Sequence, residues 1–233
     1  MGVLIRWLVL VFALGALPLK AAELEFEPVT VPVRPIQVSP RVWMVQGDVG
    51  PVSAANQGFN ANAGFVVTDE GVVVFDVLGS PALGAALRAC IRDITPQPVR
   101  HVVISHYHAD HFYGLQAFTA ERRESLFPWV NQLTRIVAPG QTIDFETTFR
   151  VRGLTFRLIP AGPAHTPEDL MMLVEEEGVL FAGDLIFAGR VPYAGDADSR
   201  AWVAALDRLA MRLPRESSPV AARLPRMVWQ ISS

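Results

Sequence analysis

The sequence contains very little cysteine. Cys90 is the only cysteine among 233 residues, so the chain can form no internal disulfide. It lies in the segment Pro81–Ile94, where Leu83, Leu87 and Ile91 recur at the spacing of one helical face. We therefore expect Cys90 to be a small residue of the core and not a catalytic thiol.

The chain also lacks an excess of either charge. The chain has 20 basic and 23 acidic residues, a formal net charge of −3, and no run of like charges. This balance argues against a nucleic-acid groove or a polybasic membrane patch. The sequence also lacks a Gly-rich phosphate loop and a serine nucleophile elbow. We expect a small-molecule substrate and no nucleic-acid partner.

The one long apolar run lies at the N-terminus. Arg6 precedes residues 7–19, which are almost wholly apolar, and Ala21 and Ala22 are small residues suited to cleavage. These 13 residues are fewer than a helix needs to span a bilayer, which is about 20. We therefore expect residues 1–22 to be a signal peptide and not an uncleaved anchor. The mature chain would be periplasmic or secreted and would have no membrane span.

The rest of the chain has a mixed α/β pattern. Its 51% hydrophobic content and its length suit one large core, so we expect one domain at 23–213 and an atypical tail at 214–233. Gly- and Pro-containing turns separate short apolar runs, and two amphipathic stretches have helical spacing. The expected strands are 42–46, 63–68, 72–76, 101–105, 136–138, 149–151, 155–159, 170–175 and 179–182, and the expected helices are 81–94 and 199–212.

Four potential metal ligands fall within six positions just after the expected strand 101–105. They are His106, His108, Asp110 and His111, and they include three of the five histidines in the chain. In an extended loop, His106 and His108 point the same way and can bind one metal ion, while Asp110 and His111 point into adjacent space. A solvated polar loop would not concentrate histidine in this way.

Two further residues of ligand type follow later strands. His165 lies in a turn after the expected strand 155–159, and Asp184 lies at the end of the expected strand 179–182. Taken alone, His165 could be an ordinary loop histidine and Asp184 a turn-forming residue. Together with the earlier cluster, they make three strand ends that each provide a ligand-type side chain, which is where α/β layers present their reactive groups.

The pattern H-x-H-x-D-H after a strand, then a lone histidine, then Gly-Asp at another strand end resembles the metal-binding pattern of the metallo-β-lactamase superfamily. The resemblance covers roughly residues 42–213. Within that superfamily, the chain looks like the periplasmic metallohydrolases that accompany quinoprotein dehydrogenase systems. The resemblance implies an α/β (α+β) fold, a four-layer αβ/βα sandwich with the metal site at one edge of its two sheets. The C-terminal part of that sandwich would be truncated or altered here.

The resemblance also implies which residues bind metal. The cofactor would be Zn²⁺, with one or two ions per chain, although the same ligand types can hold iron. The first zinc would be bound by His106, His108 and His165, the second by Asp110 and His111, with Asp184 bridging the two.

Two acidic residues would have roles beside the metal ligands. Asp110 is the expected catalytic residue, which would orient the attacking water and pass its proton toward the leaving group. Asp76 resembles a residue that orients the site by hydrogen bonding, although it could also simply cap its strand.

The chain departs from the family pattern near its C-terminus. The superfamily usually provides one more histidine after the bridging Asp, but no histidine follows His165. The second zinc therefore lacks its last expected ligand. The tail from Arg215 shows neither strand alternation nor a helical stripe. Read in a shifted frame from Glu216, the codons of the tail permit the peptide Val-Val-Pro-Gly-x-Gly-Pro-Ala, where x is one variable residue. This peptide matches the family's loop except that it lacks the histidine.

The expected function is that of a zinc-dependent hydrolase. A metal-bound hydroxide would attack a small ester, lactam, lactone or thioester, and the missing histidine could impair this activity. One alternative is a catalytically weak periplasmic accessory or binding protein of a quinoprotein redox system, with a periplasmic redox partner. Another is a di-iron oxidoreductase of the same fold.

The shifted-frame hypothesis makes a prediction about the gene. If a frameshift occurred near Arg215, the nucleotides from Glu216 onward will encode the permitted peptide in the shifted frame. Resequencing of this stretch tests the hypothesis. Codons that specify other residues in that frame would rule it out.

Overall fold

The computed structural model describes residues 27–118, 137–188, 191–212, 226–228 and 230–231. The expected signal peptide, residues 1–22, lies outside these ranges. Among the described residues, no helix is both long enough and apolar enough to cross a membrane.

The first half of the domain is a five-stranded sheet with one covering helix. Its strands lie in sequence order, and all neighbours are antiparallel except the last pair, which is parallel. The strands are β1 (Pro35–Ser39), β2 (Val42–Val45), β3 (Ala63–Thr68), β4 (Gly71–Phe75) and β5 (Val99–Val103). Helix α1 (Pro81–Ile94) connects the parallel pair β4 and β5, as such a crossover requires.

Helix α1 forms where its sequence predicts. Ser80 caps it, because its side chain accepts a hydrogen bond from the backbone N–H of Leu83 at 3.2 Å, and Pro81 occupies the first turn. Its apolar face packs on the sheet. Cys90 is only half-buried, and its Sγ lies 3.2 Å from the carbonyl oxygen of Val33, so its place is at the margin of the core.

The second half mirrors the first with another five-stranded sheet and another helix. The strand order is β11 (Arg226–Val228), β9 (Val179–Phe181), β8 (Leu170–Val174), β7 (Leu154–Pro160) and β6 (Thr147–Val151). Helix α3 (Ser199–Arg212) packs on the outer face of this sheet. A smaller sheet pairs β10 (Phe187–Ala188) with β12 (Gln230–Ile231). Short helices are α2 (Ala109–Phe112), η1 (Tyr113–Phe118) and η2 (Gly183–Leu185).

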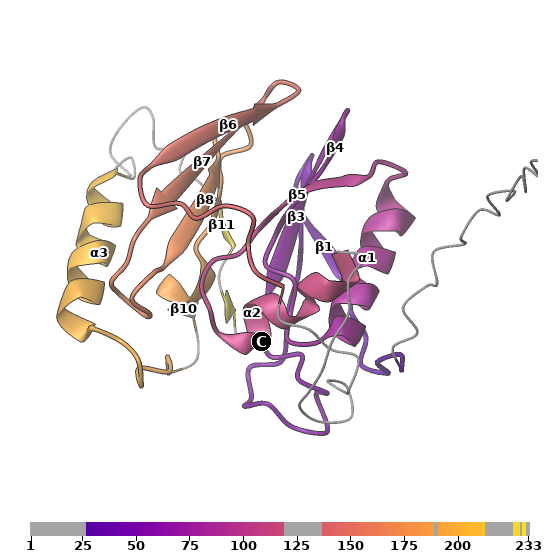
Figure 1. The fold of residues 1–233 in the computed structure, drawn as a ribbon, viewed down its shortest axis with the longest axis horizontal. Helices are drawn as coiled ribbons and strands as arrows, with labels where there is room; N and C mark the ends of the chain where they lie inside the picture. Colours follow the sequence, from indigo (N-terminus) through magenta and orange to yellow (C-terminus); the bar gives the residue numbers. More distant parts are fainter. Residues whose placement is uncertain (1–26, 119–136, 189–190, 213–225, 229, 232–233) are drawn as a thin grey trace, which may run out of the picture.

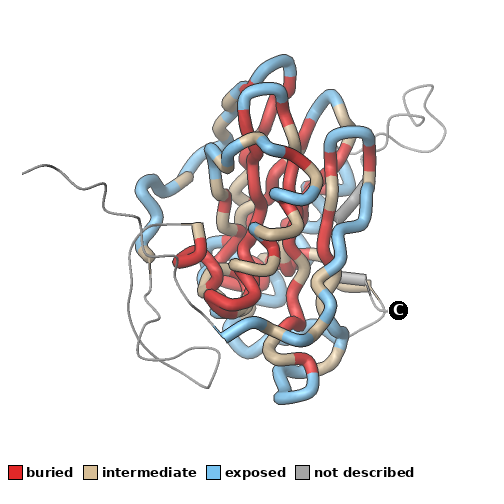
Figure 2. Tube along the Cα trace, turned by 90° about the vertical axis from the view of Figure 1, so that its right-hand side faces the viewer, coloured by how far each residue is buried: buried red, intermediate tan, exposed pale blue. Residues whose placement is uncertain are grey.

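Alternate residues of the strands fill different layers of the sandwich. On β4, Val73 and Phe75 point into the core between the two sheets, whereas Val72 and Val74 point toward α1. Phe181 of β9 meets Phe75 across the central layer with ring centroids 5.3 Å apart. The order is therefore helix, sheet, sheet, helix (Figure 1), and the buried stretches lie in the interior of the molecule (Figure 2). The four-layer sandwich expected from the sequence is confirmed.

The structure differs from the expected elements in several places. The strand expected at 101–105 begins and ends two residues earlier, and β1 forms in a proline-rich stretch that predicts only extended chain. No strand forms at 137–138, the described part of the one expected at 136–138. The tail shows no regular pattern in sequence, yet β11 pairs in parallel with β9. This pairing is possible because β9 offers a hydrogen-bonding edge on the side away from β8.

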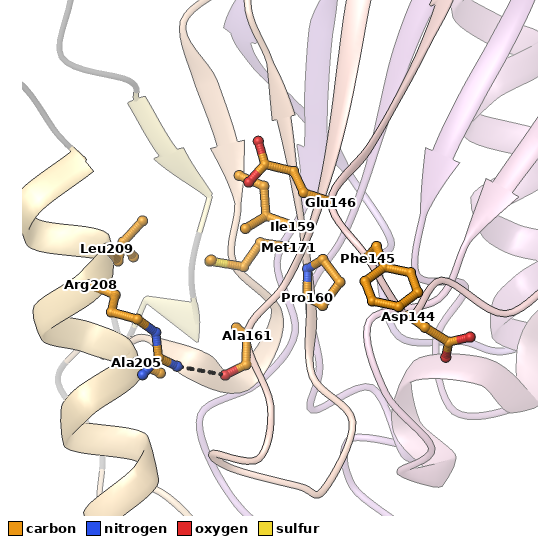
Figure 3. A pocket seen from close by; sticks show the side chains of 10 residues that line it. All are labelled: Asp144, Phe145, Glu146, Ile159, Pro160, Ala161, Met171, Ala205, Arg208 and Leu209. Atoms are coloured by element: carbon orange, nitrogen blue, oxygen red, sulfur yellow. Dashed lines mark hydrogen bonds between the residues drawn. The ribbon is translucent and has the colours of Figure 1, made fainter.

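A cavity of about 280 Å³ lies between α3 and the second sheet (Figure 3). Its apolar walls include Met171 and Leu209, and Arg208 reaches across to the carbonyl oxygen of Ala161 at 3.5 Å. None of the metal ligands expected from the sequence lines this cavity.

The sandwich brings several strand ends to one edge. The parallel strands β4 and β5 end on the same side, and β7 and β9 run in the same direction because both are antiparallel to β8. Residues that follow these four strands therefore meet at the edge shared by both sheets.

The close packing of the two sheets predicts the effect of a methyl group at Gly64. A Cβ at this position would lie 2.1 Å from Cε1 of Phe181, a buried ring with no room to move. We expect Gly64→Ala to lower the free energy of unfolding by about 1–3 kcal/mol, measured by urea titration.

The matched control is Gly140→Ala, because a Cβ there meets no atom within 4 Å. Its effect should stay within about 0.5 kcal/mol. In a Phe181→Leu background, Gly64→Ala should cost less than in the wild type. An equal cost in both backgrounds would contradict the proposed clash.

Candidate metal centre

The six ligand-type residues expected from the sequence all lie at the shared edge of the sheets. Each comes from a segment that follows a strand, so the backbone of the sandwich sets their approximate positions. His106 and His108 follow β5, Asp110 and His111 belong to α2, His165 follows β7, and Asp184 belongs to η2 after β9.

His106, His108 and His165 form the first cluster. Their ring centroids lie 4.7 Å, 4.8 Å and 5.0 Å apart, and the rings meet edge to face. His108 Nδ1 lies 3.0 Å from His165 Nε2. One nitrogen atom of each ring lies within 4.8 Å of the corresponding atoms of the other two, which is the spacing of ligands around one metal ion.

The hydrogen bonds of His106 leave one ring nitrogen for a metal. Its Nδ1 lies 2.9 Å from Ser105 Oγ, and that hydroxyl lies 2.8 Å from the carboxylate of Asp76. Because the carboxylate can only accept, the hydroxyl donates to Asp76 and accepts from His106 Nδ1–H. The remaining atom, His106 Nε2, is buried and has no hydrogen-bond partner within the described part of the chain. Such an orphaned lone pair fits a metal ion.

Asp76 forms hydrogen bonds with Ser105, which contacts His106, and with His111. It follows β4 and adopts a left-handed backbone with φ 58°, which aspartate tolerates better than most residues. Its carboxylate accepts hydrogen bonds from the backbone N–H and the hydroxyl of Ser105, both at 2.8 Å, and contacts His111 Nδ1 at 2.8 Å. The geometry thus suits the orienting role expected for Asp76 and goes beyond capping a strand.

A second group joins His111, Asp184 and His106. His111 Nε2 lies 3.2 Å from Asp184 Oδ1, and both atoms are buried. These ligand atoms lie within 4.8 Å of one another and of a ring nitrogen of His106. Asp110 stands apart from both groups, since its Oδ2 is 3.9 Å from His111 Nε2 and accepts a hydrogen bond from Asn60 Nδ2 at 3.0 Å.

A family model described as the metallo-β-lactamase superfamily matches residues 56–216. The chain belongs to the metallo-β-lactamase superfamily.

Individual relatives share about a third or less of their residues with the chain over the matched regions. The chain is 31% identical over 152 residues to an atrochrysone carboxyl ACP thioesterase of Emericella nidulans, with 64% of this chain and 45% of that protein covered. It therefore spans about half the length of that relative.

Solved structures superimpose on most of the chain. A metallo-β-lactamase from Pontibacter korlensis gives a TM-score of 0.60 at 21% identity, over 78% of this chain and 86% of that one. A sec-alkylsulfatase from Pseudomonas sp. gives 0.62 at 18% identity, over 85% and 38%.

Burial keeps two histidines of this metallo-β-lactamase site neutral. Desolvation, assisted by the nearby His111, lowers the pKa of His106 to about 2. Burial also lowers the pKa of His165, although Asp184 opposes this shift. Both rings are therefore unprotonated at neutral pH, which is the form that binds a metal.

His111 and Asp184, in contrast, are held in their charged forms. Burial alone would lower the pKa of His111, but the carboxylates of Asp184 and Asp76 on either side raise it well above its ordinary value. Burial alone would raise the pKa of Asp184, but His111 and the other histidines hold it below its ordinary value. In the metal-free protein, the two residues therefore form a buried ion pair.

Several contributing residues were not identified from the sequence. Ser105, directly before His106, links that ring to Asp76, and this adjacency was the only available signal. Trp202 of α3 packs edge-on against His165 with centroids 5.3 Å apart, and it was predicted only as part of a helix face. Asn60 comes from a loop without regular structure and has no sequence signal that connects it to Asp110.

The lowered pKa of His106 predicts how the metal-free protein responds to acid. Its folded pKa lies below its ordinary value of 6.5, so the unfolded chain binds more protons and stability falls as the pH drops below 6.5. Between about pH 7.5 and about pH 5.5, this residue should account for a loss of about 1.4 kcal/mol. His106→Gln should remove that part of the loss, measured by urea titration in the presence of a chelator.

His101→Gln is the control, because this histidine is exposed on β5 away from the cluster. Its acid response should match that of the wild type. An unchanged response in His106→Gln would show that His106 is not held neutral by burial.

Proposed function

We propose that the chain is a zinc-dependent hydrolase of thioesters or related small esters and lactams, with one tightly bound zinc ion. The observation that carries this proposal is the convergence of His106, His108 and His165 around one point, where one ring nitrogen of each lies within 4.8 Å of those of the other two. Three neutral imidazoles are a common ligand set for catalytic zinc, and they leave one coordination position open.

A second zinc ion has fewer ligands available. Among the residues that the structure describes, Asp110, His111 and Asp184 are the ligand-type side chains beside the first cluster that could hold it. Both ring nitrogens of His111 already face carboxylates, at 2.8 Å and 3.2 Å. We therefore propose that a second ion binds much more weakly than the first.

The residues around the zinc site support hydrolysis. When bound, zinc lowers the pKa of a coordinated water to near neutrality and polarises the substrate carbonyl. Asp110 lies beside the cluster, its side chain 26% exposed and held by Asn60, so it can orient a water and accept its proton. Asp184 stays negatively charged beside His111, and its Oδ2 lies 3.6 Å from His165 Nε2, so it adds a carboxylate at the edge of the zinc site.

The relatives support a thioester substrate. The Emericella nidulans relative is named as a thioesterase acting on an acyl-carrier-protein substrate. In this chain, the open side of the site carries two exposed tyrosines, Tyr107 and Tyr193, whose rings lie 5.0 Å and 5.9 Å from that of His108. Such rings can pack against the acyl part of a substrate.

The N-terminal sequence indicates where the protein is located. Residues 1–22 have the layout of a signal peptide, so we propose that the mature protein is periplasmic or secreted. A role beside a periplasmic redox partner would be compatible with this location, but none of the described contacts favours it.

Metal analysis together with a substrate panel tests the function. We expect the purified protein to contain about one zinc per chain and to hydrolyse a chromogenic thioester, ester or lactam. His108→Ala should lose the zinc and at least about 100-fold in kcat/KM, because it removes one of three ligands.

His101→Ala is the matched control, since it removes the one histidine outside the site. It should retain zinc and activity. Full zinc and activity in His108→Ala would refute the ligand assignment. Iron in place of zinc, without hydrolysis, would instead support the oxidoreductase alternative.

A further inference from the structure

His108 is the most exposed of the three zinc-site histidines. Its side chain is 18% exposed, whereas those of His106 and His165 are buried in the protein. Packing therefore restrains its ring less than the other two. The ring needs another restraint to keep Nδ1 beside His165 Nε2.

That restraint comes from a carboxylate on the segment before α3. Asp196 Oδ2 lies 3.2 Å from His108 Nε2, the nitrogen on the far side of the ring from His165. We propose that Asp196 is a positioning residue that fixes the tautomer and the orientation of His108. The part of this inference that concerns zinc rests on the proposed metal site.

The chemistry of the two groups determines where the proton lies. A neutral imidazole carries one proton, and an ionised carboxylate only accepts hydrogen bonds. The proton of His108 is therefore held on Nε2, which donates to Asp196, and Nδ1 keeps the lone pair that a metal needs. This is the arrangement by which carboxylates orient histidine ligands.

Asp196 belongs to a segment that contacts the site on both sides. Before it, the ring of Tyr193 lies 5.9 Å from that of His108. After it, the backbone N–H of Asp198 donates to the carbonyl oxygen of Ala164 at 3.1 Å, next to His165. The position of Asp196 beside His108 is thus set by the same segment that supports His165.

Asp198 also fixes the start of α3. Its side chain accepts hydrogen bonds from the backbone N–H groups of Arg200 and Ala201, and its carbonyl oxygen accepts one from Trp202 at 2.8 Å. The indole of Trp202 packs on His165. Helix α3 therefore anchors the segment whose Asp196 orients His108.

The side chain of Asp196 is 47% exposed, which limits how it can act. Solvent screens a charge in such a position, so its electrostatic effect on the site is small. Its contribution is geometric, because one hydrogen bond selects the tautomer and the ring orientation. A side chain that keeps an acceptor oxygen should therefore preserve the effect without the charge.

Three variants test this proposal. Asp196→Ala removes the acceptor, Asp196→Asn keeps an acceptor oxygen without the charge, and Asp207→Ala removes an exposed carboxylate of α3 elsewhere. The first measurement is the tautomer of His108 in the metal-free protein, from long-range ¹H–¹⁵N spectra of ¹⁵N-histidine-labelled samples. The second is zinc affinity, measured by competition with a chromogenic chelator.

The wild type, Asp196→Asn and Asp207→Ala should show His108 protonated on Nε2 and should bind zinc within about threefold of one another. Asp196→Ala should show a mixture of tautomers and bind zinc about 10–100-fold more weakly. An unchanged tautomer and an unchanged affinity in Asp196→Ala would overturn the proposal. If the wild type binds no zinc, the proposed function fails, and the tautomer in the metal-free protein still decides the role of Asp196.

Discussion

The site depends above all on the three hydrogen bonds of one buried carboxylate, Asp76. This residue follows β4 and binds Ser105, which follows the neighbouring strand β5, so it joins the ends of the two parallel strands. Through the Ser105 hydroxyl it sets the tautomer of His106, and through a direct contact it holds His111. A buried carboxylate must have such partners, because an unpaired charge in this position would be strongly destabilising. The same requirement therefore stabilises the fold and orients the histidines.

The sandwich combines ligands that are distant in sequence. The first sheet contributes His106 and His108, and the second contributes His165 and Asp184, so the site forms only when both sheets pack together. The rings of Phe75 and Phe181 stack between the two sheets. Asp76 follows Phe75 by one residue, and Asp184 follows Phe181 by three. The apolar core and the polar edge are thus parts of the same strands. Burial at this edge then keeps His106 and His165 neutral while the carboxylates keep His111 charged.

The sequence predicted the fold and the main cluster because both depend on local patterns. Short apolar runs between Gly- and Pro-containing turns indicated most strands, the helical spacing of Leu83, Leu87 and Ile91 indicated α1, and four ligand-type residues fell within residues 106–111. The contributions of Asn60 and Asp196 could not be predicted in this way. They depend on how irregular loops return to the site from 50 and 88 positions away, and no periodicity in the sequence records such a path. The strands of the tail were missed for the same reason, since they form by pairing with β9 and β10.

The central claim is that His106, His108 and His165 together hold one zinc ion. Anomalous diffraction at the zinc edge from crystals of the purified protein tests it most directly. One strong peak is expected at about 2.0–2.1 Å from His106 Nε2, His108 Nδ1 and His165 Nε2. A strong peak elsewhere, with no anomalous density between these three rings, would contradict it.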